Sequence, residues 1–230
     1  METSKKGIGR NWKRIYGVYR NIPKVYDRTN RFISFFQDIR LRKEVLDIVA
    51  QNTKSNSRIL DAGAGTGIMS KLYKGMKNAD ITMLDYSAEM LENSGMKCEM
   101  VQGSFDRMPF REGAFDSVIM GFSFHASRDM YRSASEINRI CKRCLGIVGF
   151  GKPSGIFDKL LVSAYLNFLL PVMAFISTPR HYKDFLIIKK IYSELPENEA
   201  SKSILEKYFK TLFFGQKVRG FTFQFVGLKG

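Results

Sequence analysis

The chain contains few of the side chains that form disulfides or bind metals. Only three cysteines occur in 230 residues, and no apolar segment of the secretory kind opens the sequence. An odd number of cysteines without such a segment argues against a disulfide framework, so we expect a reducing, cytoplasmic environment. Cys141 and Cys144 form a single C-x-x-C pair, but the only histidines are His125 and His181. Because structural zinc takes four ligands, we expect no metal site.

Acidic residues are also scarce. The chain has 37 Lys and Arg against 22 Asp and Glu, a net charge of +15, and much of the excess lies in residues 1–30, which we treat as a basic N-terminal arm. Such a charge favours contact with nucleic acid, an anionic membrane surface or an acidic substrate, and its sign alone does not choose among them. A solvated arm that binds nothing is the alternative.

No internal repeat or low-complexity tract divides the chain, and a hydrophobic fraction of 44% is ordinary for one globular domain. We therefore expect a single domain over residues 1–230. Strand-like apolar runs alternate with helical patterns, which is typical of a parallel sheet covered by helices. The runs expected to be strands of this kind are 58–61, 80–85, 97–102, 115–120 and 145–150.

Two other segments have clear patterns. Residues 31–49 carry apolar side chains at mostly helical spacing, which predicts an amphipathic helix packed on the core. Near the C-terminus, the aromatic-rich runs 209–214 and 221–228 are separated by a short connection. Such a connection predicts an antiparallel strand pair.

Residues 160–176 contain no charge and include Pro171. The segment is somewhat short for a membrane span, so a buried helix pair and a membrane-contacting helix are both open. In either case it follows the carboxyl end of a strand, where α/β sheets open a ligand crevice. We divide the chain into a cofactor-binding core at 31–153, a helical lid at 154–196 and a C-terminal helix with a strand pair at 197–230.

A glycine loop follows the first predicted strand. The run from Ile59 to Gly67 places glycines at 63, 65 and 67, and a helical pattern opens at Ile68. Glycine allows a sharp turn and lets a ligand lie against bare backbone, while the unpaired amides at the start of the next helix face that ligand. A tight structural turn is the alternative. Asp85, at the end of the next strand, lies where a ribose diol is held.

The loop differs from the dinucleotide-binding pattern, G-x-G-x-x-G, in its spacing and in having Asp61 before it. A carboxylate at that point repels a pyrophosphate and suits a cationic ligand. S-adenosylmethionine has an adenosine, an ammonium and a sulfonium, and no phosphate. The sequence therefore favours S-adenosylmethionine as the cofactor.

Together with the stretches Met108–Phe110 and Phe115–Val118, this loop and Asp85 resemble a Rossmann-like, class I S-adenosylmethionine-dependent methyltransferase. Further motifs make the chain similar to the ubiquinone/menaquinone biosynthesis C-methyltransferase family over roughly residues 24–229. These motifs are Tyr26–Asn30, Gly121–Phe122, Glu136 with Arg139, and Lys152–Pro153. The resemblance implies an α/β fold with a mostly parallel central sheet, a C-terminal antiparallel strand pair, helices on both faces and a helical lid after the fifth strand.

The resemblance also implies a cofactor site. The glycine loop and Asp61 are expected at the methionine part, Asp85 at the ribose hydroxyls and Tyr86 beside the adenine. Ser104 stands where the family usually has an aspartate near the adenine amine, and a hydroxyl can still accept a hydrogen bond. The full expected set is Tyr26, Asp61, Ala62, Gly63, Gly65, Gly67, Asp85, Tyr86, Ser104, Phe105 and Gly121.

Two departures from the family leave the substrate open. His125-Ala126 stands where an Arg-Asn pair is usual, and the usual Pro-Gly-Gly turn is absent around residues 143–145. Methylation of a quinol ring carbon needs a base that removes the phenolic proton, and His125 is the candidate, with a buried structural histidine as the alternative. The rings of Tyr26, Phe122 and Phe124 are candidates for facing the sulfonium, with core packing as the alternative.

The expected partners are a small lipophilic substrate and, through the apolar segment and the basic charge, an anionic membrane surface contacted peripherally. The first rival is an RNA or tRNA methyltransferase, suggested by the basic arm and its interleaved aromatic residues. The second rival is a protein that binds S-adenosylmethionine or a lipid without turnover. The oligomeric state is open.

Overall fold

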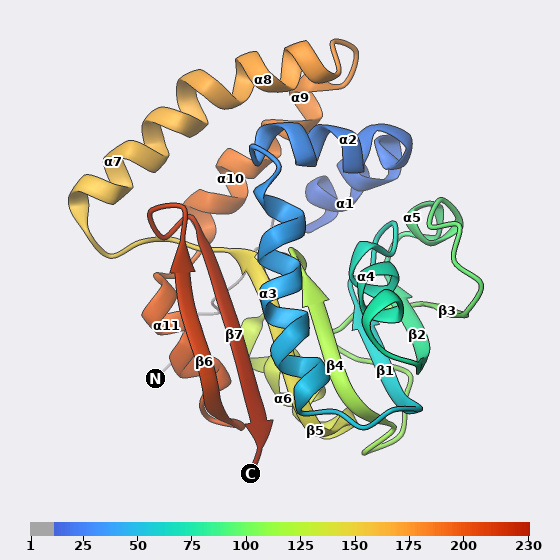
Figure 1. The fold of residues 1–230 in the computed structure, drawn as a ribbon. Coiled ribbons are helices and arrows are strands. Elements are labelled where there is room, and N and C mark those ends of the chain that lie inside the picture. Colours follow the sequence, from blue (N-terminus) through green and yellow to red (C-terminus); the bar gives the residue numbers. More distant parts are fainter. Residues whose placement is uncertain (1–11) are drawn as a thin grey trace.

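The computed structural model describes residues 12–230, with side chains from Tyr16 onward. The described residues form one seven-stranded sheet in the order β3-β2-β1-β4-β5-β7-β6 (Figure 1). The first five strands pair in parallel, and β7 lies antiparallel between β5 and β6. The strands are β1 (Ser57–Ala62), β2 (Ala79–Asp85), β3 (Glu99–Gln102), β4 (Phe115–Gly121), β5 (Cys141–Phe150), β6 (Phe209–Lys217) and β7 (Thr222–Lys229). The expected sheet, with its terminal antiparallel pair, is confirmed.

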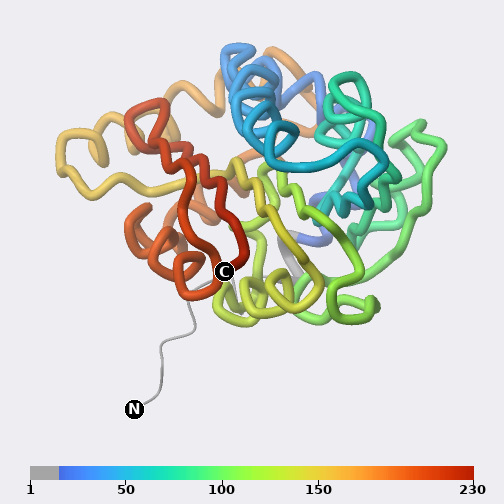
Figure 2. Tube along the Cα trace, turned by 60° about the horizontal axis from the view of Figure 1, so that its bottom comes forward, coloured from blue at the N-terminus to red at the C-terminus, as the bar shows by residue number. Residues whose placement is uncertain are grey.

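Helices cover both faces of the sheet, and Figure 2 shows the two layers on opposite sides of the strands. Two helices, α3 (Gln37–Gln51) and α4 (Ile68–Met76), pack on one face. Gly146 of β5 allows the close approach of α3, because a Cβ there would lie 2.4 Å from Val49. The other face carries α6 (Met130–Ile140), α10 (Ile187–Glu194) and α11 (Asn198–Leu205).

Further helices gather over the carboxyl ends of the parallel strands (Figure 1). Several of them share a separate apolar core with residues of α10. They are α1 (Trp12–Asn21), α2 (Pro23–Ile33), α5 (Ala88–Glu92), α7 (Ile156–Ala164), α8 (Leu170–Ser177) and α9 (Tyr182–Phe185). The expected helix at 31–49 is in fact the end of α2 and most of α3, separated by a turn in which Phe35 and Phe36 have positive φ.

The segment for which the sequence left open a buried helix pair or a membrane-contacting helix is one continuous helix of 22 residues, 156–177. Its central turn, Tyr165–Leu169, is a π turn in which the amide of Leu170 donates to the carbonyl of Tyr165. The extra residue in this turn accommodates Pro171, which has no N–H to donate, without breaking the helix. By length and composition this helix could cross a membrane.

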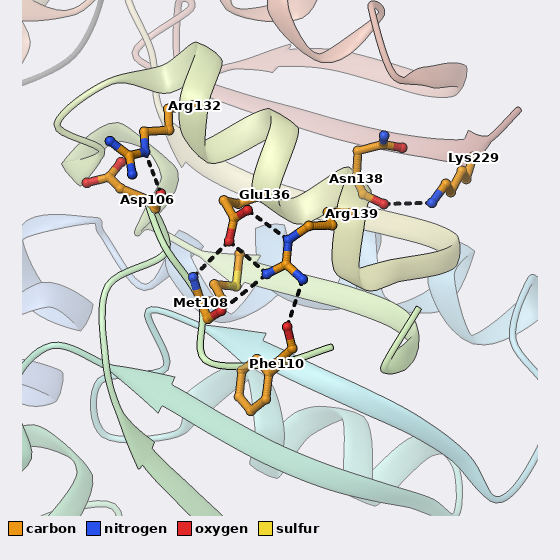
Figure 3. Close-up of polar contacts among 8 residues, drawn as sticks. All are labelled: Asp106, Met108, Phe110, Arg132, Glu136, Asn138, Arg139 and Lys229. Atoms are coloured by element: carbon orange, nitrogen blue, oxygen red, sulfur yellow. Dashed lines mark hydrogen bonds and ion pairs between the residues drawn. The ribbon is translucent and has the colours of Figure 1, made fainter. Parts of the chain in front are cut away.

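The connection after β3 is held against α6 by Glu136 and Arg139 (Figure 3). Arg139 pairs with Glu136 at 2.8 Å and donates to the carbonyl oxygens of Phe110 and Met108, while the amide of Met108 donates to Glu136. The hydrogen bonds from Arg139 lower the pKa of Glu136. Helix α6 then runs directly into β5 at Cys141, so the missing Pro-Gly-Gly turn corresponds to a helix-to-strand junction without a loop.

Candidate active site

The glycine loop joins β1 to α4 with three glycines in left-handed backbone conformations. Gly63, Gly65 and Gly67 have φ of +71°, +54° and +77°, a region that side chains other than glycine adopt at a cost. A Cβ on Gly63 would also lie 2.4 Å from the Cβ of Ser123, so the loop passes close to the chain after β4. At Gly65 the space is open. The loop therefore exposes backbone to the region above the sheet.

Asp85 ends β2 and fixes this loop from the side. Its two carboxylate oxygens each accept a backbone hydrogen bond of 2.8 Å, one from the amide of Gly65 and one from the amide of Ser87. Burial raises the pKa of Asp85, and the backbone amides work against that rise. Each oxygen keeps further lone pairs, so the carboxylate can still accept from a diol.

A cavity of about 90 Å³ lies above the loop, between β1, β2 and β4. Most of the expected cofactor residues line it. These are Tyr26, Gly63, Gly65, Asp85, Tyr86, Phe105 and Gly121. Sequence reasoning missed other lining residues, among them Tyr16, Tyr19, Arg42, Thr66, Met69, Ser87, Met90 and Ser123. The first cavity thus forms at the carboxyl ends of the strands, where the sequence placed a ligand.

Four expected cofactor residues lie outside this lining. Asp61 is buried, and one of its oxygens accepts from the amide and hydroxyl of Ser70 at 3.0 and 2.7 Å. Its other oxygen, Oδ1, is buried without a hydrogen-bond partner among the described residues. Burial raises the pKa of Asp61 to about 6, with Ser70 and Arg42 opposing the rise. Asp61 therefore anchors the start of α4 and keeps one acceptor free beneath the loop.

The other three have structural surroundings. The carbonyl of Ala62 accepts from the hydroxyl of Ser123 at 2.8 Å. A Cβ on Gly67 would lie 3.0 Å from Met83, so only glycine fits there without displacement. Ser104 is hydrogen-bonded to Asp106 in a turn below the cavity wall. Cofactor contact by these residues stays a prediction.

Helix α1 covers the first cavity on the side of Tyr86. Tyr16 and Tyr19 both line it, and the ring of Tyr16 meets that of Tyr86 edge-on with centroids 4.6 Å apart. At the end of the helix, Arg20 pairs with Glu89 of α5 at 2.8 Å. Part of the expected basic arm is therefore a helix over the site, while residues 1–11 lie outside the described part of the chain.

A second cavity, of about 230 Å³, adjoins the first. The two share Tyr26, Arg42 and Phe122 in their walls. Aromatic and aliphatic side chains dominate the second cavity, and its polar residues gather on α2, α3 and the tip of the β6–β7 hairpin. The rings among its lining residues are Tyr26, Phe35, Phe122, Phe150, Tyr165 and Phe221. The two cavities thus meet at one wall.

The shared wall contains a buried ion pair. Arg42 and Asp38, both on α3, are less than 5% exposed, and Arg42 Nη1 lies 3.1 Å from Asp38 Oδ2. The guanidinium lies over the ring of Phe122 at 4.6 Å, and its Nε has no partner among the described residues. Burial lowers the pKa of Arg42, and Asp38 opposes the change. An arginine at a core-facing position of an amphipathic helix is the sequence signal that could have identified this pair.

Phe122, directly after β4, has a φ of +56°, which is strained for a residue with a Cβ. Its amide donates to the carbonyl of Val148 at 2.6 Å, and its ring contacts Phe150. This conformation turns the ring into the wall between the cavities. Phe122 and Tyr26 are thus placed where ring faces were expected, whereas Phe124 is fully buried in the core.

His125 is fully buried in a short 3-10 turn and lines neither cavity. Both ring nitrogens lack hydrogen-bond partners among the described residues, and the ring packs against Phe150 at 4.8 Å. Burial lowers the pKa of His125 to about 3. The surroundings of His125 are those of the buried histidine given as the alternative, because the turn after Phe122 directs this side chain into the core. Its role as a base stays a prediction without a supporting contact.

The groups around the first cavity fit S-adenosylmethionine. Asp85 can accept from a ribose diol, Tyr86 and Met90 offer apolar contact to an adenine, and the unpartnered oxygen of Asp61 lies beneath the loop that lines the cavity. The open space at Gly65 leaves its backbone accessible. With the doubly covered sheet and its terminal antiparallel pair, this site defines a class I S-adenosylmethionine-dependent methyltransferase.

Comparisons with known proteins agree. The family model of a methyltransferase domain matches residues 60–144. A demethylmenaquinone methyltransferase of Staphylococcus saprophyticus is 30% identical over 224 residues, 91% of this chain and 92% of that protein. The demethylmenaquinone methyltransferase of Staphylococcus aureus strain JH9 is 28% identical over 226 residues, 92% and 90% of the two chains. The chain belongs to the methyltransferase family of ubiquinone and menaquinone biosynthesis.

Solved structures share the fold. A chain of the complex between the Haloferax volcanii Trm112 methyltransferase activator and a putative methyltransferase matches with a TM-score of 0.66 at 13% identity, over 92% of this chain and 97% of that one. A possible histamine N-methyltransferase from Thermotoga maritima matches with a TM-score of 0.60 at 17% identity, over 94% and 100% of the two chains. At these identities the likeness supports the fold alone.

Proposed function

We propose that this methyltransferase transfers a methyl group to a ring carbon of a quinol-like acceptor with a lipophilic tail. The observation that carries the proposal is the second cavity, which shares a wall with the cofactor cavity and is rich in rings. An apolar cavity with a few convergent polar groups suits a flat hydrophobic molecule with a polar edge. The names of the relatives support the same acceptor class.

The polar edge of the acceptor is assigned to Arg42. Its guanidinium has an unsatisfied Nε in the wall between the cavities, and Asp38 holds it in place. A buried guanidinium favours an oxygen that carries negative charge, so it promotes ionisation of a quinol hydroxyl. Tyr26, whose pKa burial raises to about 12, stays a neutral hydrogen-bond donor in the same wall. This assignment gives the acceptor an activating group without His125.

The chemistry needs orientation more than acid–base groups. S-adenosylmethionine supplies an electrophilic methyl group when it is bound. Ionisation of the quinol raises electron density on the neighbouring ring carbon, which forms the new carbon–carbon bond as the sulfonium–carbon bond breaks. The hydroxyl proton leaves to bulk water on ionisation, and the proton lost from the methylated ring carbon restores the hydroxyl. Overall one proton is released and the sulfonium becomes a neutral thioether. The rings of the shared wall hold the acceptor flat and exclude water from this step.

The test is incubation of the protein with isotopically labelled S-adenosylmethionine and three acceptors, followed by mass analysis. The acceptors are a demethylated naphthoquinol with a short prenyl tail, the same ring without a tail, and total RNA. We expect label in the quinols and none in RNA. Label in RNA together with salt-sensitive RNA binding would contradict the proposal in favour of a nucleic-acid substrate. Cofactor binding without label in any acceptor would favour a non-catalytic binding protein.

A further inference from the structure

The 156–177 helix presents an apolar outer face to the surroundings. It includes Phe157 and Phe168, which are 62% and 76% exposed, and the face follows helical spacing. Its polar member, Asn167, is hydrogen-bonded to Ser163 and Lys189. The exposed large side chains are Ile156, Phe157, Leu160, Leu161, Phe168, Leu169, Val172, Phe175 and Ile176. A helix facing water normally has the opposite pattern, so this face marks an interaction surface.

From this surface we propose that the outer face of the 156–177 helix docks in the plane of an anionic phospholipid bilayer and opens the acceptor cavity to the lipid. The inference rests on the proposed lipophilic acceptor and adds the surface from which that acceptor is collected. The helix lies along the edge of the molecule above the carboxyl ends of the strands (Figure 1). It is therefore placed beside the site.

The apolar surface continues into the second cavity. Leu161 belongs to the outer face of the helix and also lines the cavity. Phe35, in the α2–α3 turn, and Val218, at the tip of the β6–β7 hairpin, are likewise both exposed and part of the lining. The mouth of the cavity is thus edged by apolar side chains from three elements. A lipid tail can pass from such a mouth into a bilayer without crossing water.

Positive charge at the end of the helix favours anionic lipid. Exposed basic residues lie on α2 and after α8, and Arg28 ties the two elements together by donating to the carbonyl of Ser177 at 3.1 Å. These exposed residues are Lys24, Arg28, Arg31, Arg180 and Lys183. No exposed residue of the 156–177 helix is acidic, and its partly buried Asp158 faces Arg219 at 3.6 Å. A second copy docked on this face would bring the same positive charges together, whereas anionic headgroups neutralise them.

The helix lies on the membrane and does not span it. Its inner face, including Val162, Leu166 and Leu170, is buried in the apolar core shared with α2 and α10. A spanning position would remove these side chains from that core. An amphipathic helix whose inner face packs on protein and whose outer face is apolar matches an in-plane attachment.

Vesicle sedimentation tests the surface. Wild-type protein should sediment with vesicles of phosphatidylglycerol and phosphatidylcholine at low salt and less with phosphatidylcholine alone. Replacing both exposed rings, Phe157→Asp with Phe168→Asp, should weaken partitioning at least about tenfold. Reversing two charges, Arg180→Glu with Lys183→Glu, should weaken it about tenfold at low salt and less at high salt. Leu212→Asp and Lys54→Glu, exposed changes elsewhere, are the matched controls and should bind as wild type.

An activity assay separates this inference from the proposed function. The variant with both exposed rings replaced should methylate a tail-less quinol in solution at the wild-type rate. Its rate of methylation of a long-tailed quinol in vesicles should be at least about tenfold lower than that of wild type. Equal vesicle binding by wild type and both double variants would overturn the docking surface. A wild-type dimer that the ring variant converts to monomer, without vesicle binding, would overturn it in favour of self-association. Vesicle binding by a protein that methylates no quinol would leave the surface intact and refute the acceptor.

Discussion

Arg42 is a buried cation that its ion pair with Asp38 only partly satisfies. The Nε of its guanidinium has no partner among the described residues, and Oδ1 of the buried carboxyl of Asp61 also has none. Buried polar atoms without partners cost stability and are rare in folded proteins. Arg42 lines both cavities, so a ligand at the shared wall can complete the hydrogen bonding of its Nε.

Replacing Arg42 tests its assignment to the acceptor. Arg42→Ala should lower kcat/KM for the quinol about 100-fold, because the developing oxyanion loses a charged donor. The kcat/KM of Arg42→Lys should lie between those of wild type and Arg42→Ala, since an ammonium keeps the charge but lacks the planar set of donors. The dissociation constant for S-adenosylmethionine, measured by calorimetry, should change less than about fivefold. Lys43→Ala, exposed on the same helix, is the control. A large loss of cofactor affinity with an unchanged quinol KM would assign Arg42 to the cofactor.

His125 gives a prediction about stability. Its pKa is lowered to about 3 by burial, while an unfolded histidine titrates near about 6.5. Between these values the unfolded chain binds a proton that the folded chain excludes. The free energy of unfolding therefore decreases as the pH is lowered, by about 1.4 kcal/mol per pH unit. His125→Leu should remove that loss, and Asp61 titrates alike in both proteins and cancels in the comparison.

Urea unfolding of wild type and His125→Leu at pH 7, 6 and 5 measures this difference. We expect the variant to lose less stability than wild type as the pH falls, and to retain methyl transfer within about threefold at pH 7. Parallel stability curves would contradict the buried, neutral histidine. A loss of turnover with unchanged cofactor affinity would instead support His125 as the base.

At the scale of elements, the sequence was informative wherever local pattern and burial agree. The strands β1, β2 and β4 were predicted within a residue or two because their apolar runs are buried on both faces. The start of β5 was missed by four residues, since the exposed Lys142 and Arg143 interrupt its apolar pattern. The sequence left the burial of residues 160–176 open, because an apolar run has the same composition whether it is buried or exposed.

The candidate site also has parts that the sequence predicted and parts that it did not. The glycine loop and Asp85 were found from spacing, because their function depends on local backbone geometry. The second cavity is formed by α2, α3, α7 and the β6–β7 hairpin, which are distant in sequence, and no local motif marks it. The sequence left the position of His125 open, because the positive φ of Phe122 changes which of the following side chains face the core.

Helix α1 gives a prediction at this scale. The first cavity is smaller than most small-molecule sites, and Tyr16 of α1 occupies one side of it against Tyr86. We expect α1 to move when the cofactor binds. Tyr16→Ala should therefore raise both the association and dissociation rates of S-adenosylmethionine several-fold in stopped-flow experiments. Asn21→Ala, an exposed change at the end of the same helix, is the control and should change them less than about twofold. Unchanged rates in the Tyr16 variant would argue against a covering role.

At the scale of the whole molecule, three features converge on the carboxyl edge of the sheet. From the strand ends outward, the cofactor cavity comes first, the ring-lined cavity next and the apolar face of the 156–177 helix last. Exposed positive charge lies around the C-terminal end of that helix, where Arg28 donates to the carbonyl of Ser177. This order gives a path from lipid to acceptor cavity to methyl donor.

The most direct measurement is the position of the transferred methyl group in the product. The protein is incubated with S-adenosylmethionine carrying a labelled methyl group and a demethylated naphthoquinol, and the product is fragmented by mass spectrometry. We predict that the label is bonded to a ring carbon. Label on a quinol oxygen, or an unlabelled quinol in the presence of native protein that binds the cofactor, would contradict carbon methylation at the wall between the two cavities.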